Sequence, residues 1–192
     1  RKILKKFELI ERSGYRFVWK NRNYKDFDSF MRILKSRQRK NIKKEREGIT
    51  DYGIKFILKD NKNLTIDDWS IFYEFYCKTY LERYQKPYFN IDFFRNIHRK
   101  RLSLNPLIIF AQKDNEFVAA ALFFVKNNEL YGRHWGSNIK IKDLHFELCY
   151  YQGIEYCIRN KLEIFDPGIQ GEYKMRRGFE AIETYSYHLF LL

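Results

Sequence analysis

Ionisable and amide side chains crowd beside glycines between residues 131 and 179, at the places where a strand would lead into a helix. This span contains YGRHWGS, then LHFELCYYQGIEYCI, then FDPGIQGEYKMRRGF. Buried polar groups cost free energy unless they are paired, so an ordinary core does not require so many of them. This density therefore indicates a binding or catalytic site. Its polar members are Arg133, His134, His145, Glu147, Gln152, Gln170, Glu172 and Lys174.

Glu147 is the first candidate for a general base. It falls in the opening turn of a helix predicted over residues 144–160, and Tyr151 follows four positions later on the same side. The alternative is an acid whose charged form is stabilised by the helix N-terminus, which would make it a weaker base.

His145 and Cys149 form a second candidate pair, four residues apart, and Gln152 continues the same helix face. An imidazole beside a thiol can generate a nucleophilic thiolate. The alternative is a core histidine packed against a buried thiol.

Arg133 ends a predicted strand over residues 130–136, between two glycines that would let a ligand approach the backbone. Its guanidinium could bind a phosphate or a carboxylate. The alternative is an ion pair with Glu147 or Asp166.

The segment 168–179 offers backbone N–H groups at a helix start, together with Lys174, Arg176 and Arg177. Such a group suits an anion. Glu172 brings negative charge to the same turn and could instead serve as a base or accept a substrate ammonium. The simplest alternative is a capped turn with a salt bridge.

The hydrophobic pattern predicts the elements that must position these side chains. Alternating apolar residues and the turn signals Asp114-Asn115 and Asn127-Asn128 predict three antiparallel strands. The predicted elements of this half are strands 107–112, 117–125 and 130–136, helix 144–160 begun by Asp143, strand 162–166, short helix 172–177 and a last strand 183–192.

The preceding half is predicted to be mainly helical. An apolar stripe predicts a long helix over 26–47 whose second half is basic nearly all round, so that it projects into solvent or meets a charged partner. The remaining predicted elements are a short helix at 2–12, a strand at 17–19, a strand at 54–58, a helix begun by Thr65 and a helix begun by Asn90.

The charge of the chain is concentrated in its first quarter. The net charge of the 192 residues is +13, and residues 1–51 carry 17 Lys/Arg against 7 Asp/Glu, a net of +10. Such a segment favours RNA, phosphates or a membrane surface as partner, while the alternative is a solvated helix. The candidate anion-binding or RNA-binding residues are Arg37, Arg39, Lys40, Lys43, Lys44 and Arg46.

Composition restricts the class of protein. Hydrophobic residues make up 45% and aromatic residues 19%, which predicts a folded core rather than disorder. Three cysteines without zinc spacing indicate a reducing, cytoplasmic compartment and no metal. No signal peptide is visible, and the longest apolar run, 117–125, is far shorter than a bilayer span of about 20 residues. The chain begins without Met, which suggests a fragment or a processed piece.

The segments RFVWKNRNYKDFDSFMRILKSRQRKNIKKEREG, YGRHWG, LHFELCYYQGIEY and GIQGEYKMRRGF resemble the predicted N-acyltransferases labelled peptidoglycan biosynthesis/recognition. That family belongs to the GNAT superfamily and is related to the Fem-type aminoacyltransferases. The resemblance runs from about Gly14 to His188. It implies an α/β (α+β) fold, with a GNAT-like mixed, mainly antiparallel sheet flanked by helices and an N-terminal basic helix.

Family members are roughly twice as long, so the resemblance implies the C-terminal half alone. On this basis residues 1–24 are a remnant of, or a linker from, a missing GNAT-like half, and residues 25–192 are the acyltransferase domain.

The resemblance implies transfer of an acyl group to an amine, in a slot where strands 130–136 and 162–166 diverge. N-acyl transfer needs a base, hydrogen-bond donors for the oxyanion and a groove for the acyl carrier. The acceptor would be a small molecule or a peptidoglycan precursor. The candidate catalytic residues are Glu147, Glu172 and His145, and the candidate substrate-binding residues are Tyr131, Arg133, Trp135, Gln152, Gln170 and Lys174.

The acyl donor is left open among aminoacyl-tRNA, an acyl carrier and acyl-CoA. The stretch 136–144, GSNIKIKDL, lacks the R/Q-x-x-G-x-G/A pattern of coenzyme A-dependent members, and Asp143 would repel a pyrophosphate. A tRNA partner suits the basic segment better. The alternatives are a non-catalytic RNA-binding module and an inactive, truncated relative of the acyltransferases.

Overall fold

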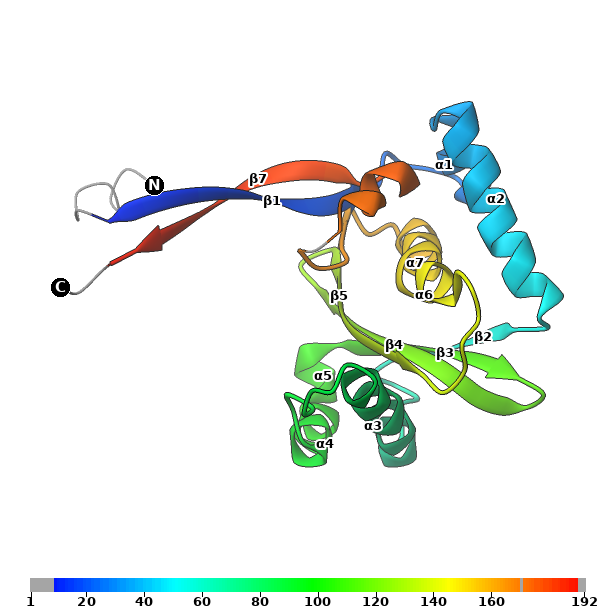
Figure 1. Ribbon diagram of the computed structural model, residues 1–192, viewed down its shortest axis with the longest axis vertical. Helices are drawn as coiled ribbons and strands as arrows, with labels where there is room; N and C mark the ends of the chain where they lie inside the picture. The colour runs from blue at the N-terminus through cyan, green and yellow to red at the C-terminus, as the bar shows by residue number, and fades with distance from the viewer. Residues whose placement is uncertain (1–8, 170, 190–192) are drawn as a thin grey trace.

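The computed structural model describes residues 9–169 and 171–189, whose strands form one sheet in the order β2-β3-β4-β5-β6-β1-β7 (Figure 1). Neighbouring strands are antiparallel except β5 and β6, which are parallel. The predicted mixed, mainly antiparallel sheet flanked by helices is thereby confirmed. The strands are β1 (Ile10–Lys20), β2 (Lys55–Lys59), β3 (Pro106–Lys113), β4 (Glu116–Lys126), β5 (Glu129–Ser137), β6 (Ile164–Asp166) and β7 (Glu180–His188).

Helices cover both faces of the sheet (Figure 1). α3 and α4 lie on one face, and α2 and the helix that contains α6 and α7 lie on the other. Among the described residues, none of these helices combines the length and apolar character needed to cross a bilayer. The helices are α1 (Phe27–Arg32), α2 (Ser36–Asp51), α3 (Ile66–Leu81), α4 (Ile91–Arg99), α5 (Arg101–Leu104), α6 (Leu144–Phe146), the π-helical turn η2 (Glu147–Tyr151), α7 (Gln152–Asn160) and the 3₁₀ helix η3 (Glu172–Arg177).

The three predicted antiparallel strands are confirmed as β3, β4 and β5. Both predicted turns adopt positive φ at both residues, with Asp114 at 49° and Asn115 at 66°, and Asn127 at 51° and Asn128 at 63°. Asp and Asn tolerate this left-handed region better than most residues, which is why these pairs reverse the chain here.

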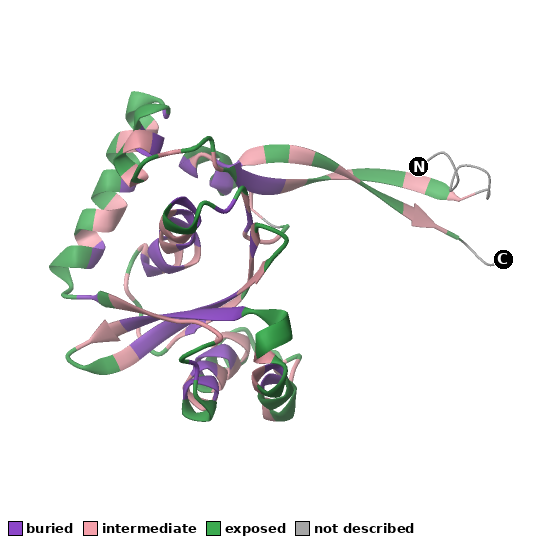
Figure 2. Ribbon diagram, turned by 180° about the vertical axis from the view of Figure 1, so that it is seen from behind, coloured by how far each residue is buried: buried purple, intermediate pink, exposed green. Residues whose placement is uncertain are grey.

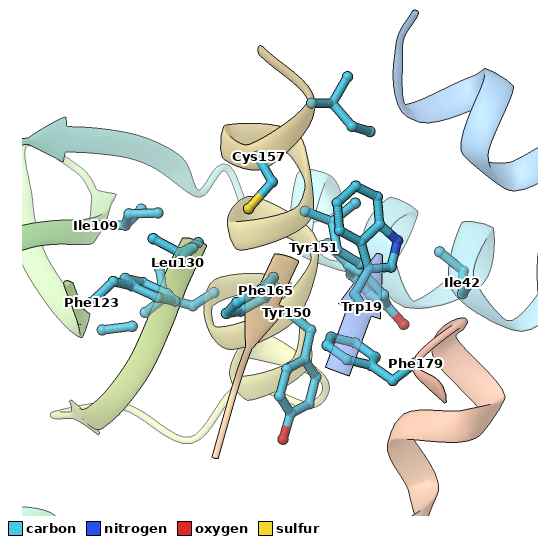
Figure 3. Packing of buried hydrophobic residues seen from close by; sticks show 14 of the residues in the cluster. Trp19, Ile42, Ile109, Phe123, Leu130, Tyr150, Tyr151, Cys157, Phe165 and Phe179 are labelled. Atoms are coloured by element: carbon cyan, nitrogen blue, oxygen red, sulfur yellow. The ribbon is translucent and has the colours of Figure 1, made fainter. Parts of the chain in front are cut away.

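The hydrophobic core has one part on each side of the sheet, and buried residues follow the central strands (Figure 2). On the side of α2 and α7, Leu130 and Phe165 of the parallel strands belong to the same buried cluster as Ile42 of α2 and Cys157 of α7 (Figure 3). This core fixes the helix of residues 144–160 against the two parallel strands, and so places its first turns beside the strand ends.

β1 and β7 form a two-stranded ribbon that projects from the body of the molecule (Figure 1). Nine residue pairs join 10–18 to 180–188, and Tyr15 in the ribbon is 62% exposed. The helix predicted at 2–12 is wrong for residues 10–12, which belong to β1, and its residues 1–8 lie outside the described part of the chain. The division into 1–24 and 25–192 stays a prediction, with β1 hydrogen-bonded inside the same sheet.

The single helix predicted over 26–47 is wrong, because the chain breaks between α1 and α2. The N–H of Ile33 bonds back to the carbonyl oxygens of the preceding turn, and the side chain of Gln38 accepts the N–H of Lys35 at 3.0 Å and starts a new helix. α2 also buries Ile42 and Ile49 one above the other, so it packs on the core rather than projecting with a polar surface all round.

Candidate functional site

β5 and β6 pair over three residues and then separate. The last pair is Tyr131 with Asp166, after which β6 ends while β5 continues to Ser137. From Gly132 onward, the edge of β5 that faces away from β4 therefore has no strand partner among the described residues. β6 ends at this point, and Pro167 after it still lies close to Gly132, so the predicted slot between the two strands stays a prediction.

A β-bulge lies at the start of this unpaired edge. Leu122 of β4 pairs with His134, and the next residue, Phe123, pairs with Gly132, so Arg133 is the extra residue. A bulge bends its strand and redirects side chains, and such irregularities are frequent beside functional sites. Arg133 is consequently exposed at the divergence.

Arg133 stays on its own strand. Its Nη1 donates to the carbonyl oxygen of Gly132 at 2.9 Å, and its guanidinium carbon lies 5.3 Å from the ring centroid of Tyr131. Tyr131 in turn donates its hydroxyl proton to Glu129 at 2.6 Å. Of the two alternatives for Arg133, the ion pair with Glu147 or Asp166 is wrong.

Those two carboxylates have other partners, which the sequence did not reveal. Arg16 of β1 donates to Asp166 at 3.0 Å, and Arg46 of α2 binds Glu147. Asp166 also accepts the N–H of Gly168 at 2.9 Å, which fixes the turn that leaves β6.

Trp135 lies where β5 runs beside α3. A side chain at Gly136 would place its Cβ 2.0 Å from the carbonyl oxygen of Phe75, so only glycine lets α3 approach this closely. The hydroxyl of Thr79 donates to the carbonyl oxygen of Trp135 at 3.3 Å. The indole ring is thereby held 4.8 Å, between centroids, from the imidazole of His145.

Burial lowers the pKa of His145 to about 4, and the nearby cations Lys174, Arg177 and Arg83 add to the effect. The imidazole is therefore neutral at neutral pH. Burial raises the pKa of the Cys149 thiol, so the thiol stays protonated. Among the described residues no hydrogen bond joins the two, and the arrangement favours the packed histidine over a thiolate nucleophile.

Lys174 is a buried cation of the segment 168–179, with only 2% of its surface exposed. Its Nζ donates to the carbonyl oxygen of Gly168 at 2.7 Å, and no second hydrogen bond of Nζ is found in the described part of the chain. Burial lowers its pKa to about 8, opposed by the charge of Asp166. An ammonium has three donors, so Lys174 retains hydrogen-bonding capacity for a ligand oxygen.

The rest of the segment 168–179 is partly structural. Arg177 is buried, donates to Glu45 of α2 at 2.6 Å and lies 3.5 Å above the ring centroid of Phe146. This is the salt bridge that the capped-turn alternative expected. Glu172 is exposed at the start of η3, and Gln170 lies outside the described residues.

Glu147 faces α2 instead of the strand divergence. Both its oxygens accept from Arg46, each at 3.1 Å, and Gln152 donates to it at 2.8 Å. Burial raises the pKa of Glu147, while Arg46 and Gln152 oppose this effect. Glu147 and Gln152 line a cavity of about 530 Å³ against α1 and α2. The predicted site residues thus fall into two groups, and Glu147 contacts neither His145 nor Lys174.

The basic residues of α2 also divide. Arg46 pairs with Glu155 at 2.8 Å as well as with Glu147, and Arg39 donates to the carbonyl oxygen of Leu34. The others are exposed, namely Arg37, Lys40, Lys43 and Lys44. In the described part of the chain no cluster of His, Cys, Asp and Glu is arranged to hold a metal ion.

Comparison with known proteins relates this arrangement to a family. The FemAB_like family model, described as peptidoglycan biosynthesis/recognition, matches residues 1–191. No individual curated protein matches the chain.

Three solved structures share the fold at low sequence identity. The L-PGS structure from Bacillus licheniformis has a TM-score of 0.68 at 9% identity, covering 97% of this chain and 62% of that one. The C-terminal domain of a putative lysylphosphatidylglycerol synthetase from Agrobacterium fabrum has a TM-score of 0.59 at 13% identity, covering 92% of this chain and 53% of that one. A protein of unknown function from Bacteroides thetaiotaomicron has a TM-score of 0.56 at 12% identity, covering 95% of this chain and 64% of that one. The chain therefore spans between about half and two thirds of the length of these structures.

Proposed function

The chain belongs to the FemAB-like family of peptidoglycan biosynthesis and recognition, and from that premise we propose that it transfers an aminoacyl group to an amine where β5 and β6 diverge. The proposal combines the family with a site whose chemistry suits acyl transfer. The likeness in fold to the C-terminal domain of a putative lysylphosphatidylglycerol synthetase supports the aminoacyl character of the donor.

The observation that carries the proposal is the buried ammonium of Lys174, which donates to the carbonyl oxygen of Gly168 in the turn that follows β6. A tetrahedral intermediate of acyl transfer carries an oxyanion, which a fixed cation in a site shielded from water stabilises more strongly than solvent does. Gly168 holds the ammonium in place through one hydrogen bond and leaves donors free.

In the proposed reaction the acceptor amine attacks the carbonyl carbon of an aminoacyl ester. A carbon–nitrogen bond forms, and the carbonyl electrons move to the oxygen that Lys174 binds. When the carbonyl reforms, the carbon–oxygen ester bond breaks, and the proton of the attacking nitrogen goes to the leaving oxygen. No external oxidant or metal is needed for this balance.

The other predicted catalytic residues receive different roles. The neutral imidazole of His145 packs on Trp135 and holds the indole beside the site. Glu147 is bound on both oxygens by Arg46. We therefore propose that it joins α2 to the helix of residues 144–160 and does not abstract a proton. Glu172 is exposed and has no assigned step.

The donor we propose is an aminoacyl-tRNA, with the exposed cations of α2 contacting its phosphates. The acceptor we propose is the amine of a peptidoglycan precursor, as the family description suggests. We also propose that a GNAT-like domain N-terminal to this chain takes part in the reaction.

The test is transfer of a radiolabelled aminoacyl group from tRNA to amines, with acyl-CoA and an acyl carrier protein as alternative donors. We expect transfer from aminoacyl-tRNA and a loss of about 10²–10³ in kcat for Lys174→Met. Absence of transfer from every donor, with the upstream half supplied, would reject the proposal. RNA binding without transfer would instead favour the RNA-binding module, the second candidate, which the exposed cations of α2 support.

A further inference from the structure

A second cavity, of about 370 Å³, lies beside Trp135 at the end of β5. It opens between the end of α3 and the segment 137–142 that leaves the strand. Its lining residues are Thr79, Glu82, Arg83, Trp135, Ser137, Ile139, Lys140, Ile141 and Lys142. We call it the β5-end pocket.

The β5-end pocket is basic. Arg83, Lys140 and Lys142 line it against one carboxylate, Glu82, and none of the three cations forms an ion pair with any described residue. Unpaired cations around a concave surface concentrate anions there.

The cavity at α2 has the opposite character. It is lined by four carboxylates, Asp28, Glu47, Asp51 and Glu147, against the two cations Lys43 and Arg46. A basic lining is therefore not a general property of the hollows of this positively charged chain.

The wall of the β5-end pocket is fixed by hydrogen bonds. Lys78 of α3 donates to the carbonyl oxygen of Asn138 at 2.8 Å, and the N–H of Asn138 bonds to Val118 of β4 at 2.8 Å. The hydroxyl of Ser137 accepts the N–H of Ile139 at 3.1 Å. A wall held in this way does not have to be ordered when a ligand binds, which removes one cost of binding.

Trp135 links the pocket to residues of the proposed transfer site. Trp135 lines the pocket and also contacts His145, whose pKa is lowered by both Lys174 of the site and Arg83 of the pocket. A ligand on the indole would therefore lie next to the place where the acyl group reacts.

We propose that the β5-end pocket binds a nucleotide, with its phosphate among Arg83, Lys140 and Lys142 and its base stacked on Trp135. Arginine and lysine bind phosphate through charge and several donors, and bases stack on aromatic side chains irrespective of sequence. The assignment of this nucleotide to the acyl donor rests on the proposed function, whereas the binding of a nucleotide in the pocket does not.

Side chains, and not a backbone cradle, would hold the phosphate here. The segment 137–142 contains no glycine, and Asp143 stands before the first turn of the helix with its side chain outside any capping hydrogen bond. A carboxylate at that position opposes an anion at the helix start, so the anion has to lie on the lysine side of the segment.

Tryptophan fluorescence tests the proposal without any enzymatic assay. Trp19 and Trp69 are buried at 1% and 0% exposure, and only Trp135 of the three is partly exposed. AMP is expected to quench the emission saturably, and Trp135→Phe is expected to abolish the quenching. Quenching that rises linearly with AMP, or that persists in Trp135→Phe, would overturn the proposal.

The charge requirement is tested by replacing Arg83, Lys140 and Lys142 together with Gln. The Kd for AMP is expected to rise by at least about tenfold, as expected for the loss of charge-assisted hydrogen bonds. The matched control replaces three exposed lysines outside the pocket and removes the same net charge, namely Lys62, Lys126 and Lys161. An equal loss of affinity for AMP in both triple variants would show a general charge effect and would overturn the proposal that the pocket binds a nucleotide.

Two further ligands distinguish the source of the nucleotide. A short RNA ending in CCA that competes with AMP more strongly than coenzyme A does would assign the pocket to tRNA. Stronger competition by coenzyme A would assign it to an acyl-CoA donor, and would reject the aminoacyl-tRNA of the proposed function while supporting the pocket. Failure of both to compete with AMP would overturn the proposal.

Discussion

Arg46 of α2 grips both carboxylate oxygens of Glu147, 101 positions away in the chain, through Nε and Nη2 at 3.1 Å each. Only 2% of Glu147 is exposed, so removing the guanidinium would leave a buried charge without its partner. We expect Arg46→Met to lower the free energy of unfolding by about 3–5 kcal/mol, measured by urea denaturation. The control is Arg95→Met, which removes an exposed pair with Asp92 and should cost at most about 1 kcal/mol.

The cost of Arg46→Met should depend on pH. Burial raises the pKa of Glu147 even beside Arg46, so its contribution to stability is greatest at low pH and is lost as the pH rises through the folded-state pKa. Without Arg46 this pKa rises further. The difference in free energy of unfolding between Arg46→Met and the wild type should therefore shrink from pH 7 towards about pH 4. An equal difference at both pH values would contradict the role given to Glu147.

Lys174 should give the transfer rate an alkaline limb. Its pKa is lowered to about 8, so the ammonium that binds the oxyanion is lost above that pH. We expect kcat/KM of the wild type to fall above about pH 8 in buffers of constant ionic strength.

The free energy of unfolding should rise with pH in the range where kcat/KM falls. Because the folded-state pKa of Lys174 lies below the unfolded value of 10.5, the unfolded chain binds more protons between the two, and stability rises with pH there. Lys174→Met should lack this rise. A rise of equal size in the variant would show that Lys174 does not titrate in this range.

His145 should remain uncharged through the neutral range. Its pKa of about 4 lies below the ordinary value of 6.5, so folding becomes less favourable as the pH falls from 6.5 towards 4. We expect its ring resonances in NMR spectra to stay constant from about pH 8 to 5.5. His145→Gln should lose less stability than the wild type as the pH falls over the acid range. A titration midpoint of the ring resonances near pH 6.5 would contradict the burial of this ring.

Two glycines in helices should respond to alanine with opposite sign. A Cβ at Gly153 of α7 would lie 2.5 Å from the ring of Phe165, whereas at Gly48 of α2 it would meet nothing within 4 Å. We expect Gly153→Ala to destabilise by about 1–3 kcal/mol through overpacking, and Gly48→Ala to stabilise by about 0.5–1 kcal/mol. Thermal denaturation of both variants gives the comparison, and equal effects would show that α7 does not pack closely on β6.

The exposed cations of α2 should contribute a salt-dependent part of RNA binding. Replacing Arg37, Lys40 and Lys44 by Gln should reduce the slope of log K against log salt concentration by up to about 2, since each phosphate contact on a single strand contributes about 0.7. Filter binding between low and moderate salt measures the slope. The triple variant of Lys62, Lys126 and Lys161 is the control, and an equal change in it would remove α2 as the contact surface.

Local patterns were sufficient to predict the centre of the sheet. The alternation of apolar residues and the Asp and Asn pairs at the turns placed β3, β4 and β5 nearly residue by residue. Local patterns did not predict a divergence of the parallel strands; that expectation came from the family resemblance, and the structure shows only that their pairing stops at Tyr131 and Asp166.

What the sequence concealed depends on contacts between distant positions. The pairing of β1 with β6 and β7, and the ion pairs of α2 with Glu147 and Arg177, join residues more than a hundred positions apart. No local periodicity encodes them. The division of the predicted site into a group at α2 and a group at the strand divergence depends on these contacts, and for that reason one continuous slot was expected.

The wide turn η2 lies where this helix contacts two different neighbours. A single π turn inside an α-helix accommodates one residue more than the regular repeat, and such turns are frequent at functional sites. His145 contacts Trp135 of β5, whereas Glu147 and Tyr151 form hydrogen bonds to residues of α2. A change in the pitch of this helix would therefore be transmitted both to the sheet and to α2.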